Sequence, residues 1–357
     1  MILTQCLNDL KKKPDSDEYR AAVSLLLKEE KQWKTKLQPE QICSILEALC
    51  RCQDLKANDP IPLLEKYEDI CKEAEDSAFA KVLHKWAEVL IYHDHRDKAY
   101  DKCCEYLYYI CKGSEIKDDI VLYSFRKAND YVFDDIKNGT LSLQMPSQFN
   151  DPLDTLLFNW IDSKIKSCTN VNSKEFYYLL KRAAEHFRVR CFVKPKDPPK
   201  NDNRLEVERI HPLMWAHYAD SHKGICIQYR FKASFFKQNE SEKSFKRYNK
   251  EQYTRKIPNL NNSISIANAL FTKDILWRYE EEVRILDLDY NDYKDKFGVK
   301  LENLNEDAII EAVYFGYYCN DDTKAQVLNA IRSTPIKAYQ MVIDDNNLHQ
   351  LKAKRIS

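Results

Sequence analysis

The chain has 357 residues, and 44% of them are apolar or aromatic, which is enough material for a sizeable core. This length predicts two domains or one large one, because single cores stop growing at roughly 250 to 300 residues. Lys plus Arg and Asp plus Glu number 56 each. The balance excludes a global charge argument for nucleic-acid or membrane binding, so only local patches can support either role.

Cysteine usage bears on the compartment. Twelve cysteines in so long a chain, with Cys103 and Cys104 adjacent, are more typical of reduced thiols than of a secreted disulfide framework. The opening residues show no apolar secretory segment, and no run approaches the ~18 apolar residues of a membrane span. We therefore expect a soluble cytoplasmic protein without membrane contact.

The first 112 residues lack glycine, and their apolar residues recur at steps of three and four. This spacing predicts two amphipathic helices with Phe79, Val82, Trp86 and Leu90 on one and Ala99, Cys103, Leu107 and Ile110 on the other. The pair, from 78 to 111, resembles a tetratricopeptide repeat without its usual glycine. We place a domain boundary at Gly113 and predict that residues 1–113 form a helical, repeat-like domain that binds a protein partner.

Strand and helix patterns alternate irregularly after residue 114. Strands are predicted at 121–126, 141–145, 188–193, 224–230, 281–288, 312–317 and 337–343, and helices at 129–137, 173–187, 213–221 and 322–332. Gly139 is the predicted C-terminal cap of the helix at 129–137. The irregular order predicts an α+β domain over 114–357, with a split or bent, antiparallel-rich sheet, as the catalytic part.

Residues 230–260 hold nine Lys or Arg against three Glu, with aromatic residues between them. Such side chains can grip phosphates and stack on bases, so this stretch is a candidate nucleic-acid contact or lid. An exposed lysine-rich loop that serves solubility explains the composition equally well.

The segment Phe149-Asn150-Asp151-Pro152-Leu153-Asp154 follows the second predicted strand. Asn and Asp before Pro favour a turn, which explains the composition without any ligand. The alternative is that the carboxylates of Asp151 and Asp154 meet a metal or a sugar hydroxyl.

Residues 213–229 read LMWAHYADSHKGICIQY and concentrate polar and aromatic groups before Gly224. Such imidazoles often only bond a backbone carbonyl. The five-residue separation of His217 and His222 misses the four-residue spacing of a helical two-His zinc site, so no structural metal is expected. Trp215, His217 and Tyr218 are predicted to form the aromatic, hydrogen-bonding wall of a pocket.

The stretch from Trp277 to Ile285 carries three acids and two arginines. As a strand, its period of two places Glu280, Glu282 and Arg284 on one face. As a helix, Glu280 and Arg284 form an ordinary ion pair worth about 0.3 to 0.5 kcal/mol, and a run of Glu is often only a solvated face.

Four motifs in this order resemble the bacterial family called domain of unknown function 2971. They are Tyr123 with Phe125-Arg126, Phe149 to Asp154, Met214 to Gly224, and Trp277 to Arg284. The resemblance covers about residues 121 to 317. It implies membership of mobile, defence-like gene sets, and thus a role in phage defence or toxin action.

The order of motifs also resembles ADP-ribosyltransferases, and this likeness implies NAD as a substrate. Arg126 would then anchor NAD, Tyr218 would stack on nicotinamide, and Glu280 or Glu282 would be catalytic. Arg126 and Arg284 could meet the pyrophosphate. The full set of expected binding residues is Tyr123, Arg126, Asn150, Asp151, Asp154, Trp215, His217, Tyr218 and Arg284.

Three functions follow from these patterns. The favoured one is an NAD-consuming transferase or glycohydrolase. The second is a magnesium-dependent nuclease with Asp151, Asp154, Glu280 and Glu282 as oxygen ligands. The third is a non-catalytic interaction protein whose motifs only hold turns.

Overall fold

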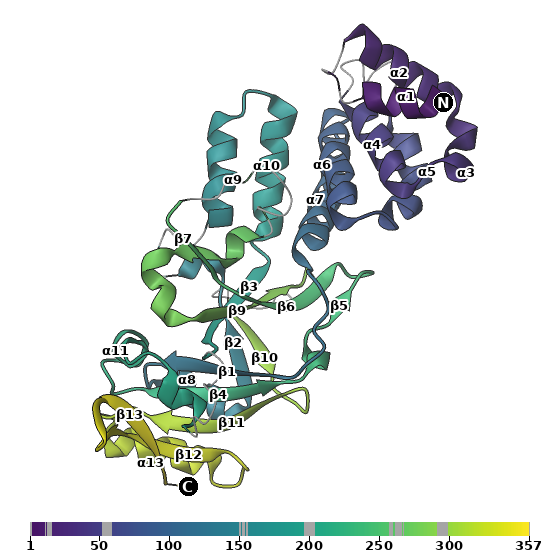
Figure 1. Cartoon of the computed structure of the whole chain (residues 1–357). Coiled ribbons are helices and arrows are strands. Elements are labelled where there is room, and N and C mark those ends of the chain that lie inside the picture. Colours follow the sequence, from purple (N-terminus) through teal and green to yellow (C-terminus); the bar gives the residue numbers. More distant parts are fainter. Residues whose placement is uncertain are drawn as a thin grey trace. The chain divides into compact units, whose positions relative to one another are not determined.

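The computed structural model describes residues 2–10, 12, 16–51, 59–149, 151, 154, 156–195, 204–256, 260, 266, 268–290 and 299–356. Within them the chain divides into two compact units (Figure 1). Unit 1 comprises Met1–Gly113, Thr155–His186 and Pro258–Leu270, and unit 2 comprises Ser114–Asp154, Phe187–Ile257 and Phe271–Ser357.

Unit 1 is helical. Its helices are α1 (Ile2–Asp9), α2 (Asp17–Lys28), α3 (Trp33–Lys36), α4 (Pro39–Cys50), α5 (Ile61–Lys72), α6 (Asp76–Tyr92), α7 (Arg96–Cys111), α9 (Leu156–Ser167) and α10 (Val171–Ala184). The predicted hairpin is α6 with α7, and all eight of its predicted apolar residues are buried. Among the described residues, no helix is long and apolar enough to cross a bilayer.

Two later segments belong to unit 1, which differs from the prediction of one continuous domain over 114–357. The reason lies in α10, whose buried Phe176 stacks on His84 of α6 with ring centroids 4.0 Å apart. An apolar helix face must be covered, and α10 covers its own against α6 and α7. The first segment of unit 1 ends at Gly113, which is the boundary predicted from the end of the helical spacing of apolar residues.

Unit 2 is built on a nine-stranded sheet of order β13-β12-β11-β4-β1-β3-β9-β6-β5. Its strands are β1 (Ile120–Arg126), β3 (Phe187–Val193), β4 (Ile225–Phe231), β5 (Gln238–Asn239), β6 (Ser244–Lys250), β9 (Glu282–Leu288), β11 (Ala308–Phe315), β12 (Lys337–Asp344) and β13 (Asn347–Arg355). Neighbours are antiparallel except β11 and β12. Two small sheets pair β2 (Thr140–Leu143) with β10 (Lys300–Asn303), and β7 (Gln252–Thr254) with β8 (Thr272–Asp274). The fold is α+β, as predicted.

Alternate residues of the strands feed two cores, one on each face of the sheet. On one face Leu122 packs with Ile227 and with the buried sides of α8 (Asp130–Asn138) and α13 (Asp321–Ile331). On the other face Phe125 packs with residues of α11 (Leu213–Tyr218). Gly139 ends α8 in the left-handed region with φ 61°, as its predicted capping role requires.

The sheet is interrupted between β1 and β3. Strand β1 pairs with β4 from Ile120 to Arg126, and β3 pairs with β9 from Phe187 to Val193. In the described part of the chain, β1 and β3 pair at one position alone, Tyr123 opposite Val193. This agrees with the predicted split or bent sheet.

Part of the predicted lid or contact stretch at 230–260 belongs instead to the sheet, since β6 pairs with β9. Four of its aromatic residues are buried in the core: Phe231, Phe235, Phe236 and Phe245. Base stacking needs an accessible ring face, so these four rings are not a surface for nucleic acid.

Candidate functional site

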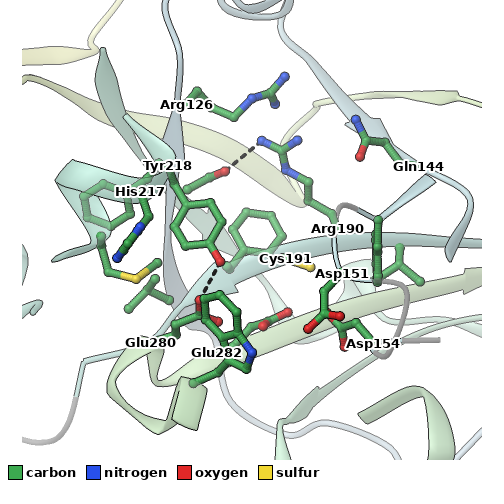
Figure 2. A pocket seen from close by; sticks show the side chains of 18 of the residues that line it. Arg126, Gln144, Asp151, Asp154, Arg190, Cys191, His217, Tyr218, Glu280 and Glu282 are labelled. Atoms are coloured by element: carbon green, nitrogen blue, oxygen red, sulfur yellow. Dashed lines mark hydrogen bonds between the residues drawn. The ribbon is translucent and has the colours of Figure 1, made fainter. Parts of the chain in front are cut away.

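A cavity of about 470 Å³ opens in unit 2 where β1 and β3 part (Figure 2). Its volume lies within the range of about 300 to 1,000 Å³ that is usual for ligand sites. Eight of the predicted site residues line it: Tyr123, Arg126, Asp151, Asp154, His217, Tyr218, Glu280 and Glu282. Residues far apart in the sequence thus converge on one cavity.

Two of the other predicted site residues, Trp215 and Arg284, do not line the cavity. Trp215 is 1% exposed and packs edge to face on Phe125 with ring centroids 5.0 Å apart, so it belongs to the core rather than to the cavity wall. Arg284 is buried and does not line the cavity. Asn150 lies outside the described residues. Tyr123 lines the cavity, but its hydroxyl donates to Glu206 Oε2 at 3.0 Å.

Glu280 and Glu282 reach the cavity through a turn that the sequence patterns did not predict. Residues Ile275–Glu280 form a short 3-10 helix, η7, which Asp274 caps by accepting from Leu276 N at 2.8 Å. Glu281 then takes a left-handed φ of 48°, and β9 begins at Glu282. The strand predicted at 281–288 therefore begins one residue later than expected, and residues 277–280, for which a strand and a helix were both considered, lie in η7.

Lys273 of β8 is the centre of the acidic end of the cavity. Its Nζ donates to Glu280 Oε2 at 2.6 Å and to Glu282 Oε2 at 2.8 Å, and lies 3.7 Å from Asp154 Oδ2. The ammonium also lies over the ring of Trp277, 5.1 Å from its centroid. No sequence pattern predicted a role for Lys273, although a lone lysine in the mainly apolar stretch before Trp277 was a usable signal.

The buried side chain of Arg284 contacts three acidic residues at or near the acidic end of the cavity. Its Nη2 donates to Asp154 Oδ1 at 2.6 Å, and its Nε lies 2.7 Å from Glu282 Oε1 and 2.9 Å from Glu251 Oε1. The predicted pair of Arg284 with Glu280 is not what the structure shows. Because Arg284 does not line the cavity, the structure does not place it for the expected contact with a pyrophosphate, and its guanidinium contacts Glu282 instead.

The pKa values of the two glutamates of the cavity are shifted in opposite directions. Burial would raise the pKa of Glu282, but Arg284 and Lys273 outweigh it and hold the pKa well below its usual range. Burial raises the pKa of Glu280, although Lys273 and Tyr218 partly offset it. Carboxylates whose environments separate their pKa values can take different roles in one reaction.

Tyr218 connects the segment at 213–229 to the acidic end of the cavity. Its hydroxyl donates to Glu280 Oε1, and burial and this bond raise the pKa of the phenol. His217 lines the same cavity. Figure 2 shows the Tyr218 ring between the carboxylates and the arginines.

Gly224 fixes the same segment against β1. A Cβ at this position would lie 2.2 Å from the carbonyl oxygen of Arg126 and 3.0 Å from that of Ala219. No side chain fits so close to backbone, so glycine is required here for a close approach. The glycine thereby brings α11 and its Tyr218 to the end of the strand that carries Arg126.

The opposite end of the cavity carries two arginines. Arg126 of β1 was predicted, whereas Arg190 of β3 was missed. Burial and the like charge of Arg190 lower the pKa of the Arg126 guanidinium to about 10. The cavity therefore has a basic end and an acidic end.

Residues 214–285 match the family model described as a protein of unknown function, DUF2971. The match includes the last two of the four motifs, from Met214 to Gly224 and from Trp277 to Arg284. It confirms the family that the motifs predicted. No curated protein and no solved structure matches the chain.

Proposed function

We propose that this member of the DUF2971 family consumes NAD by cleaving the bond between nicotinamide and ribose. The observation that carries the proposal is the convergence of Arg126, Tyr218 and Glu282 on one cavity. These three residues come from separate motifs, and each has the chemistry of one part of the dinucleotide: a cation for phosphate, a ring for nicotinamide and a carboxylate for ribose.

Glu282 is suited to the bond-breaking step. When the glycosidic bond breaks, its electron pair leaves with nicotinamide, which becomes neutral, and the ribose becomes oxocarbenium-like. A carboxylate that stays ionised stabilises this positive charge and can accept a hydrogen bond from the ribose 2-hydroxyl. Arg284 and Lys273 keep Glu282 ionised through a lowered pKa.

Glu280 is suited to the second step. Water or another acceptor attacks the ribose carbon, and its proton must be taken up. The raised pKa of Glu280 makes it a stronger base than an exposed glutamate, as a general base requires. Tyr218 orients the carboxylate through its hydrogen bond and offers a ring to nicotinamide.

The magnesium-nuclease alternative fits the contacts less well. Its expected ligands include Asp154, Glu280 and Glu282, and each of these carboxylates already contacts Lys273. A divalent ion would have to compete with this buried ammonium for the same oxygens. Among the described residues, no group of three or more His, Cys, Asp and Glu is arranged to hold a metal ion.

We also propose that unit 1 binds a protein partner or acceptor, because helical hairpins offer grooves for peptides. Buried free thiols such as Cys43, Cys71 and Cys226 suit a cytoplasmic location, where NAD is available. NAD consumption there would suit a role in phage defence or toxin action. A fall in cellular NAD when the protein is produced would support that role, and an unchanged level would contradict it.

The first experiment is to incubate the purified protein with NAD, alone and with nucleic acid or cell lysate as acceptor, and to measure free nicotinamide. The proposal predicts its release. Neither binding nor consumption of NAD under any of these conditions would contradict it. Magnesium-dependent cutting of RNA or DNA that is lost in Asp151→Ala would instead favour the nuclease.

A further inference from the structure

Arg190 places a buried hydrogen-bond donor without a described partner at the wall of the cavity. It is 7% exposed and lines the cavity. Its Nη2 donates to Ser124 Oγ at 2.7 Å, whereas its buried Nε has no hydrogen-bond partner among the described residues. An unmatched buried donor is unfavourable, and more so on a charged group, so an acceptor on a ligand would relieve it.

Arg126 is also weakly held. Its Nη1 lies 3.5 Å from Ser142 Oγ and 4.0 Å from Asp135 Oδ2. The two oxygens of Asp135 already accept from the hydroxyls of Thr140 and Ser142. The carboxylate is therefore a distant and shared partner for this guanidinium.

The two guanidiniums lie close enough for each to feel the charge of the other. Figure 2 shows both at one end of the cavity and the carboxylates of Glu280 and Glu282 at the other. The repulsion from Arg190 contributes, after burial, to the lowered pKa of Arg126. Two like charges held together in a cavity indicate an anionic ligand that bridges them.

We infer that Arg126 and Arg190 form a subsite for the pyrophosphate of a dinucleotide whose reactive ribose lies at Glu282. Two guanidiniums can bond phosphate oxygens as planar forks, which suits two linked phosphates. The polarity of the cavity matches that of NAD, because its basic end meets the phosphates and its acidic end the positively charged nicotinamide riboside. The identity of the ligand rests on the proposed function, whereas the anion subsite is carried by the arginines themselves.

The test is calorimetric binding of inorganic pyrophosphate to the full chain. Binding to the wild type is expected, with at least about tenfold weaker binding for Arg190→Met and Arg126→Met, because each loses charge-assisted hydrogen bonds. Arg190→Lys keeps the charge but not the fork and should weaken binding less. The matched control is Arg188→Met, which removes a buried arginine of the same strand that does not line the cavity.

Thermal unfolding of each variant separates loss of the fold from loss of the subsite. Absence of pyrophosphate binding to the wild type would overturn the inference, as would equal binding by folded Arg190→Met, or an equal loss in Arg188→Met. The failure of the proposed function looks different: pyrophosphate is bound through the two arginines, but NAD is not cleaved. If Arg190→Met cleaves NAD as fast as the wild type, the pyrophosphate subsite is refuted but the proposed function is not.

Discussion

Arg284 donates from Nη2 to Oδ1 of Asp154 at 2.6 Å, across 130 residues of sequence. This bond joins the turn after β2 to strand β9, and thereby two of the four motifs. The same guanidinium contacts Glu282, which lines the cavity, while Arg284 itself is 1% exposed. The arginine therefore acts on the cavity through the carboxylates that it holds.

Replacement of Arg284 should destabilise the protein strongly. Arg284→Met leaves the carboxylates of Asp154 and Glu282 short of a partner in the interior, and a broken buried ion pair costs about 3 to 5 kcal/mol. Urea unfolding measures the loss. The control is Arg230→Met, whose pair with Glu311 is partly exposed and is expected to contribute less than about 1 kcal/mol. Similar small losses in the two variants would refute the positioning role.

Glu251 should give the stability a pH dependence. Burial raises its pKa well above the ordinary value, although Arg284 partly offsets this. The folded protein thus keeps a proton on Glu251 that the unfolded chain releases above about pH 4.3. The contribution of Glu251 to the free energy of unfolding is therefore full below that pH, and it is lost as the pH rises through the pKa of the folded state. Glu251→Gln should therefore gain stability relative to the wild type as the pH rises, measured by urea midpoints. A difference that is constant with pH contradicts the shift.

Glu282 should give the stability a pH dependence of the opposite sign. Although burial opposes it, Arg284 and Lys273 lower its pKa, so its contribution is present above about pH 4.3 and is lost as the pH falls toward the folded pKa. Glu282→Gln should be least stable relative to the wild type near neutral pH, and the gap should close on acidification. The same urea series tests this, and a gap that widens in acid would rule it out.

Tyr218→Phe should change the pH dependence of NAD cleavage. Its hydroxyl lowers the pKa of Glu280, so its removal raises that pKa and moves the acid limb of kcat/KM to higher pH. The control is Tyr314→Phe, which removes a bond to Gln228 outside the cavity. If the acid limb of kcat/KM lies at the same pH in Tyr218→Phe as in the wild type, the hydrogen bond from Tyr218 does not set the pKa of Glu280.

Gly224→Ala should cost far more than Gly139→Ala. The first substitution forces a Cβ to within 2.2 Å of a backbone oxygen, so the two chain segments must separate. The second meets no atom within 4 Å and adds only the strain of a left-handed φ, about 1 to 2 kcal/mol. Thermal unfolding of both variants provides the comparison. Equal losses would mean that the close approach to Arg126 is unimportant.

Local patterns were enough to predict much of the fold. The strand predicted at 121–126 corresponds to β1, the three- and four-residue steps of 78–111 to α6 and α7, and the glycine at 139 to a left-handed cap. Each of these features depends on neighbours within a few residues of one another. The choice of an α+β fold followed from their order alone.

The parts of the site that were missed depend on long-range pairing. Glu251 contacts Arg284 because β6 pairs with β9, and Arg190 faces the cavity because β3 parts from β1 beyond Tyr123. No local period encodes either register. The left-handed Glu281 also escaped prediction, because a glutamate gives no signal for positive φ.

The proposed role of Glu282 is open to a simple kinetic measurement, the rate of nicotinamide release from NAD by Glu282→Gln. If Glu282 stabilises the oxocarbenium-like ribose, kcat should fall at least about a hundredfold, as for the loss of one electrostatic stabiliser, while the Kd for NAD changes little. Asp287→Asn, which alters a buried carboxylate of the same strand outside the cavity, should keep the wild-type rate if it folds. A wild-type kcat in folded Glu282→Gln would mean that this carboxylate does not stabilise the transition state.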